Sequence, residues 1–135
     1  MNPIKEQTNN RPSNYSKWHR PPNLPNWCLL ADGDWFEMRE TGESIEPVAC
    51  IETMEIGGLF IKQAQQNYPL WKTKKYLLKE IQLRMNIPVY IVRHTSDCHL
   101  FAISRLTQDG DETSQLIYDE NQYKKFLIEI QNGGK

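Results

Sequence analysis

Two acidic residues, Asp34 and Glu52, stand where a pair of apolar segments begins and ends, within the stretch DGDWFEMRETGESIEPVACIETM. If these segments are neighbouring antiparallel strands, the start of one lies beside the end of the other, and the two carboxylates converge. Carboxylate oxygens, with the Thr53 carbonyl beside them, are ligands that suit Mg²⁺ or Mn²⁺, which polarise a phosphate and activate a hydrolytic water. The pattern therefore predicts a site for phosphodiester hydrolysis.

Each acid also has an ordinary interpretation. The sequence DGD is typical of a tight surface turn, which is the role expected for Asp32. Glu52 follows the apolar run VACI, so it is either a surface residue at a strand end or a functional carboxylate. Glu55 is expected to be solvated.

Basic residues gather in two regions, which contain Lys17, His19 and Arg20 in the first and Lys72, Lys74, Lys75, Lys79 and Arg84 in the second. We expect Lys72, Lys74 and Lys75 to contact phosphates. His19 and Arg20 are expected to follow a nucleic-acid backbone. The alternative is that the second region is a solvated helical face.

The acidic residues are positioned by a predicted β-hairpin. Short apolar runs begin at Cys28 and continue to Met54, and TGESIEP between them predicts a broad loop with Pro47 as the first residue of the returning strand. The continuously apolar run VACI indicates a strand buried on both faces. Residues 57–70 are ambiguous between a loop and a short helix.

The second half of the chain has clearer periodicity. Apolar residues at helical spacing predict an amphipathic helix from Trp71 to Met85 that stops before NIP. PVYIVRH and HLFAISRL predict two antiparallel strands around the turn TSDC, where His94 and His99 are expected at the surface. A final helix is predicted after Asp119 as N-cap, and its apolar stripe is Tyr123, Phe126, Leu127 and Ile130.

Length and composition predict one domain. Residues 1–14 are polar and aperiodic and are expected to form a flexible tail, and residues 15–135 a single domain. The prolines of NYSKWHRPPNLPNW predict an ordered, irregular arm in which Trp18 and Trp27 pack against the sheet.

Several functional classes are disfavoured by composition. The chain lacks the run of about 18 apolar residues that a membrane helix needs and the apolar core of a signal peptide, so a soluble cytoplasmic protein is expected. Its three cysteines show neither a disulfide framework nor a zinc-site spacing. The net charge of -1 does not by itself indicate a nucleic-acid binder.

The order of Asp34, a hairpin, Glu52-Thr53-Met54, a helix and the strand IPVYIV resembles the PD-(D/E)XK nuclease superfamily. The resemblance runs from Trp18 to Leu106. It implies a restriction endonuclease-like α/β fold with a central mixed sheet flanked by helices. It also implies Mg²⁺-dependent hydrolysis of DNA, with Asp34 and Glu52 holding the metal, and a homodimer where both strands are cut.

The resemblance places a lysine two residues after Glu52, where this chain has Met54. Methionine carries no charge, so one possibility is that Lys62, Lys74 or Lys75 reaches in from the following segment. The other is a degenerate site with weak or absent activity, in a nuclease-fold module that binds nucleic acid or a protein partner. An unrelated α/β domain with the same spacing is a third alternative.

Overall fold

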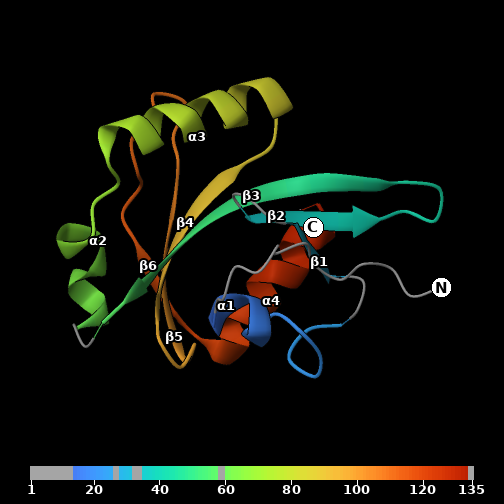
Figure 1. Cartoon of the computed structure of the whole chain (residues 1–135), viewed down its shortest axis with the longest axis horizontal. Helices are drawn as coiled ribbons and strands as arrows, with labels where there is room; N and C mark the ends of the chain where they lie inside the picture. The colour runs from blue at the N-terminus through green and yellow to red at the C-terminus, as the bar shows by residue number, and fades with distance from the viewer. Residues whose placement is uncertain (1–13, 26–27, 32–34, 58–59, 134–135) are drawn as a thin grey trace.

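The computed structural model describes residues 14–25, 28–31, 35–57 and 60–133. Its elements are α1 (Asn14–Trp18), β1 (Cys28–Ala31), β2 (Trp35–Glu40), β3 (Ile45–Ile56), the 3-10 helix η1 (Ile61–Gln63), α2 (Ala64–Asn67), α3 (Lys72–Met85), β4 (Val89–Thr95), β5 (Leu100–Arg105), β6 (Leu116–Asp119) and α4 (Glu120–Gln131) (Figure 1). In the described chain six strands form one sheet in the order β1-β2-β3-β4-β5-β6. The β3–β4 pair is parallel and the other pairs are antiparallel. The predicted α/β class with a central mixed sheet flanked by helices is confirmed and is consistent with a restriction endonuclease-like arrangement.

Helices cover both faces of the sheet. In Figure 1, α3 lies across one face, and α1 and α4 pack together against the other. Successive side chains of β3 alternate between these layers: Ala49 and Ile51 join the core under α1 and α4, and Cys50 joins the core under α3. All three are fully buried, which confirms that VACI is a strand buried on both faces.

The parallel pairing of β3 and β4 determines where α3 lies. Parallel neighbours need a long crossover, and residues between Ile56 and Val89 supply it with η1, α2 and α3. The ambiguous segment therefore contains short helices. The predicted amphipathic helix is confirmed, and it ends where Asn86 adopts a left-handed conformation with φ 55°.

The first hairpin differs from its prediction at the turn. Its connection is tight: the Thr41 N–H donates to the Ser44 carbonyl at 2.9 Å, and Gly42 takes φ +90°. Pro47 lies inside β3 rather than at its start. The register shifts between Glu37 and Met38, opposite Pro47, and this irregularity accommodates a residue without an N–H.

The N-terminal arm also differs from its prediction. It begins with a short helix, α1, whose first residue Asn14 falls within the predicted tail, and the prolines follow the helix instead of interrupting it. Trp18 is 7 % exposed and packs on Phe101 and Tyr123, as expected. Residues 1–13 and Trp27 lie outside the described residues.

The C-terminal helix α4 has the predicted start. The Asp119 carboxylate accepts from the Gln122 N–H at 2.8 Å, and the Gln122 side chain accepts from the Asp119 N–H at 2.9 Å. Tyr123, Leu127 and Ile130 are buried against the sheet. The strand β6 before this helix was not predicted, because four residues are too few to show a period.

A buried ion pair ties the sheet to the crossover. Arg93, fully buried on β4, donates to both carboxylate oxygens of Glu112, at 2.6 and 3.0 Å, and to the Tyr68 carbonyl at 2.8 Å. The Ser104 hydroxyl also donates to Glu112, at 2.5 Å. The segment around Glu112, between β5 and β6, therefore carries the counter-ion of the sheet's buried arginine.

We predict that Glu112→Gln lowers the free energy of unfolding by about 3–5 kcal/mol, because it leaves Arg93 buried without a counter-ion. Burial favours a raised pKa for Glu112, but hydrogen bonds from Arg93 and Ser104 outweigh it and hold the pKa below its ordinary 4.5. The contribution of Glu112 is therefore complete above the ordinary value and is lost as pH falls through the lowered one. Urea unfolding between about pH 7 and pH 3 measures both effects.

The control for this prediction is Glu46→Gln, because Glu46 pairs with Arg39 at 2.7 Å at the surface. It should change stability by less than about 1 kcal/mol. Equal effects of the two substitutions would contradict the role assigned to Glu112.

Candidate functional site

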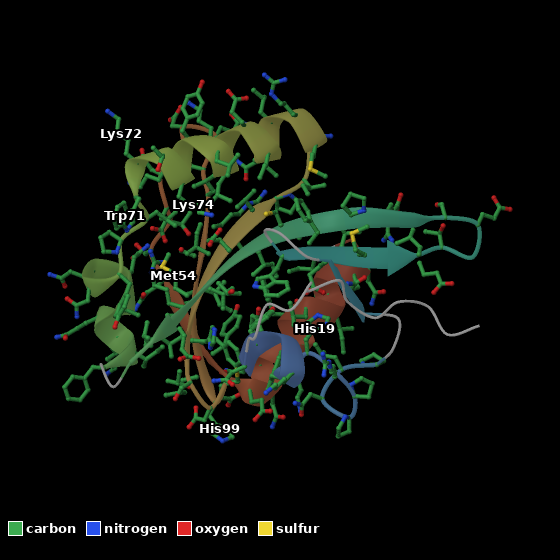
Figure 2. All side chains as sticks on the ribbon, viewed as in Figure 1. His19, Met54, Trp71, Lys72, Lys74 and His99 are labelled. Carbon is green, nitrogen blue, oxygen red and sulfur yellow. The ribbon has the colours of Figure 1, made fainter. Side chains whose placement is uncertain are left out.

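Glu52 and Met54 lie on the face of the sheet that α3 covers. They border a pocket of about 470 Å³ whose other walls are residues 67–71, Thr73 and Lys74. Lys74 reaches down from α3, and its Nζ lies 3.3 Å from Glu52 Oε2. Figure 2 shows Lys74 on the sheet side of α3 above Met54, whereas Lys72 points away from the sheet. A charged pair therefore lies beside an apolar thioether in one pocket.

The entrance to this pocket is electropositive. The first turn of α3 carries Lys72, Lys74 and Lys75 without an acidic residue, and Trp71 at its N-cap provides no side-chain hydrogen bond. The side chain of Glu52 is 15 % exposed and that of Lys74 is 37 % exposed, so the pair is partly exposed, although Glu52 Oε2 itself is buried. A small anion or a phosphate group can approach Lys74 here.

The three candidate lysines are placed differently. Lys74 is the one whose described contacts include Glu52. Lys75 lines a second cavity, of about 480 Å³, between α3 and residues 109–111. Lys62 is exposed in η1. The structure thus brings Lys74, and not Lys75, to the predicted catalytic carboxylate.

The predicted metal ligands are only partly described. Asp34 lies outside the described residues, so its convergence with Glu52 stays a prediction. The Thr53 side chain lies on the opposite face of the sheet, where its hydroxyl accepts from the Trp35 indole at 2.7 Å. Among the described residues no group of three or more His, Cys, Asp or Glu side chains is placed to hold a metal. Glu52 offers oxygen donors of the type that Mg²⁺ takes, and a second carboxylate would have to come from Asp34.

His19 is not on the surface, so its predicted contact with nucleic acid is wrong. It is fully buried, and its Nε2 lies 2.8 Å from Glu37 Oε2. The Gln131 amide donates to the other Glu37 oxygen at 2.9 Å. These contacts join α1, β2 and α4 inside the core, where buried polar groups need partners. Arg20, the neighbouring predicted contact, is exposed.

The end of β4 carries a buried histidine, and the turn that follows it carries an exposed one. His94, predicted at the surface, is 3 % exposed, and burial lowers its pKa. Its Nδ1 lies 3.7 Å from the sulfur of Cys98. Burial raises the pKa of the Cys98 thiol to about 12, so the thiol stays protonated and is no nucleophile at neutral pH. His99 is exposed, as predicted, and pairs with Glu120 at 3.1 Å.

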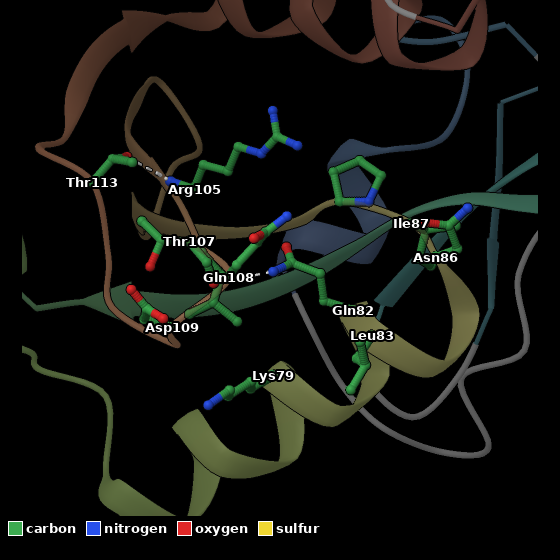
Figure 3. Close-up of a pocket in the computed structure, with 12 residues that line it drawn as sticks. Lys79, Gln82, Leu83, Asn86, Ile87, Arg105, Thr107, Gln108, Asp109 and Thr113 are labelled. Atoms are coloured by element: carbon green, nitrogen blue, oxygen red, sulfur yellow. Dashed lines mark hydrogen bonds between the residues drawn. The ribbon is translucent and has the colours of Figure 1, made fainter.

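A larger cavity, of about 790 Å³, lies at the other end of α3 (Figure 3). Two of its polar side chains, those of Gln82 and Thr113, make hydrogen bonds that hold the fold together. The Gln82 amide donates to the Thr107 carbonyl at 3.1 Å and accepts from the Val89 N–H at 3.2 Å. The Arg105 N–H donates to the Thr113 hydroxyl at 2.9 Å. We therefore interpret this cavity as the place where α3 packs against the connection from β5 to β6.

Comparison with known proteins finds no match to a family model, to a curated protein or to a solved structure. In the described part of the chain, each helix is too short or too polar to cross a membrane. The chain is thus characterised by its α/β fold and by the pocket that contains Glu52, Met54 and Lys74.

We predict that Lys74→Met changes the free energy of unfolding by less than about 1 kcal/mol, because the partly exposed pair with Glu52 is screened by water. Arg93→Met, on the same face of the sheet, should cost about 3–5 kcal/mol because Glu112 loses its buried partner. Urea unfolding of both variants gives the comparison. A large loss in Lys74→Met would mean that the lysine holds the fold together.

Proposed function

We propose that this protein is a Mg²⁺-dependent nuclease that hydrolyses phosphodiester bonds of DNA in the Glu52 pocket, with Lys74 in place of the lysine that is absent at Met54. The observation that carries the proposal is the 3.3 Å approach of Lys74 Nζ to Glu52 Oε2 within one pocket. Lys74 comes from α3 rather than β3, so the same charge reaches the carboxylate from a different element.

Each residue has a distinct role in this proposal. Glu52, with Asp34, would hold Mg²⁺, which when bound supplies a polarised phosphate and an activated water. The Lys74 ammonium carries a point charge and three donors, which orient the attacking water and stabilise negative charge developing on phosphate oxygens. Met54 cannot serve either purpose.

The basic residues outside the pocket complete the proposed substrate contact. Lys72 is exposed at the start of α3, beside the pocket wall formed by Trp71 and Thr73. Phosphates that approach the Glu52 pocket would meet Lys72 first and Lys74 next. Lys75 and Arg20 remain predicted phosphate contacts. A homodimer is proposed for cutting both strands, because one pocket serves one phosphodiester bond.

A second function is favoured by one observation, the presence of Met54. If Lys74 only neutralises Glu52, the chain is a nuclease-fold module that binds nucleic acid or a protein partner without cutting. The two functions make opposite predictions for the same variants.

We predict that Lys74→Ala lowers the rate of Mg²⁺-dependent cleavage by on the order of 10²-fold or more, because it removes an essential catalytic charge. Lys62→Ala should cut nearly as well as the unmodified chain, and Lys75→Ala should lose far less activity than Lys74→Ala, because it removes only a proposed substrate contact. The substrate is a labelled DNA that is part duplex and part single strand, and product is followed on denaturing gels. Glu52→Gln, prepared identically, reports contaminating nuclease.

Met54→Lys in the Lys74→Ala background tests whether a lysine on β3 can replace the lysine that α3 supplies. If the charge is what the pocket lacks, this second substitution should recover most of the lost activity. No cleavage by the unmodified chain, with a gain in Met54→Lys alone, would establish the non-cutting module. Unchanged cleavage in Lys74→Ala would contradict the role of Lys74.

Metal binding gives a prediction independent of turnover. Titration calorimetry with Mn²⁺ should show binding to the unmodified chain that Glu52→Gln and Asp34→Ala abolish. Lys74→Ala should bind Mn²⁺ more tightly, because a positive charge 3.3 Å from Glu52 opposes the cation. Weaker Mn²⁺ binding in Lys74→Ala would contradict this arrangement.

A further inference from the structure

The outer side of α3 exposes aromatic and basic side chains together. Lys72, Tyr76, Lys79 and Leu83 follow one another at spacings of four, three and four residues, so they share one side of the helix. Tyr76 is 67 % exposed, and Trp71, just before the helix, is 81 % exposed. Exposed apolar side chains that gather on one surface mark interaction sites, whereas singly scattered ones do not. We call Trp71 and these four residues the α3 stripe.

The stripe is continuous with the Glu52 pocket. Trp71 and Thr73 line that pocket with Glu52 and Lys74. Thr73 also lines the neighbouring cavity of about 480 Å³, together with Tyr76 and the three lysines Lys72, Lys75 and Lys79. A chain molecule that follows α3 towards its N-terminal end therefore passes the cavity lined by Tyr76 and then the pocket lined by Trp71 and Glu52.

We propose that the α3 stripe binds a single-stranded nucleic acid and leads it into the Glu52 pocket. Bases stack on Trp71 and Tyr76, and phosphates lie on Lys72 and Lys79 of the stripe and on Lys75, which lines the same cavity beside it. Exposed aromatic rings that alternate with lysines along one line suit an unpaired strand. Each base can stack on a ring, and each backbone phosphate carries a negative charge that a lysine can neutralise. The inference rests on the proposed function in taking the strand as the substrate of the Glu52 site.

The rings distinguish an unpaired strand from a duplex. In a duplex the base faces are stacked on one another, so Trp71 and Tyr76 would find no surface, although the lysines would still meet phosphates. The charges distinguish a nucleic acid from an apolar protein partner, since three lysines border the rings and favour a polyanion. Asp109 and Asp111 form the opposite wall of the cavity and repel phosphates towards the helix.

Binding is tested by fluorescence anisotropy in EDTA, where cleavage does not interfere. The probes are labelled oligothymidylate, oligouridylate of the same length, and a blunt duplex. Both single strands should bind more tightly than the duplex, and the difference between them shows which sugar is preferred. Trp71→Ala and Tyr76→Ala should each weaken single-strand binding by about tenfold, the cost of losing one stacked base. Phe60→Ala, which removes a ring 79 % exposed outside α3, should have no effect.

The lysines are tested by salt dependence. Lys72→Ala and Lys79→Ala should each reduce the slope of log affinity against log salt by about 0.7, the value for one phosphate of a single strand. Lys125→Ala, an exposed lysine on α4 across the sheet, should leave the slope unchanged.

The outcomes separate this inference from the proposed function. Tighter binding of duplex, or a Trp71→Ala variant that binds as the unmodified chain does, would overturn the stripe even if the enzyme cuts DNA. A chain that never cuts but binds single strands through Trp71 and Tyr76 would retain the stripe and disprove the nuclease. Absence of binding to all three probes would overturn the stripe in favour of a protein partner.

Discussion

A fully buried arginine on a central strand is the constraint on which the rest of this structure depends. Arg93 cannot remain in the core without partners, because an uncompensated buried charge costs several kcal/mol. It takes Glu112 from the connection between β5 and β6 and the Tyr68 carbonyl from the crossover between β3 and α3. Satisfying one guanidinium thus orders two long connections, and the second of them leads directly into Trp71 and α3.

The same constraint explains why Lys74, and not Arg93, is the cation that faces the Glu52 pocket. Met54 lies opposite Arg93 in the β3–β4 register, so a positive charge already stands on the strand beside Met54. The guanidinium is engaged by Glu112 and Tyr68 and is closed off from solvent. Lys74 approaches from the helix, keeps a partly exposed side chain and lies 3.3 Å from Glu52. One cation holds the fold and the other faces the pocket.

Helix α3 links the fold to the proposed activity. Its inner side buries Leu78 against the sheet, its first turn brings Lys74 to Glu52, and its outer side exposes the stripe that contains Tyr76. The helix exists because the parallel pairing of β3 and β4 requires a crossover, and it packs here because both strands present apolar residues to it. A proposed substrate contact and a candidate catalytic charge are therefore carried by one helix.

The sequence alone determined the features that depend on neighbours in the chain: the helical period of α3, the capping box at Asp119, and the apolar run of β3. The order of a hairpin, a helix, two strands and a final helix could be predicted from such local features. Only the tertiary structure decided that Lys74 meets Glu52 while Lys75 borders another cavity, that His19 is buried with Glu37, and that Glu112 turns inward. The physical reason is that periodicity is a local property, whereas the burial and pairing of a charge depend on elements that are distant in sequence and meet only when the sheet and its helices pack.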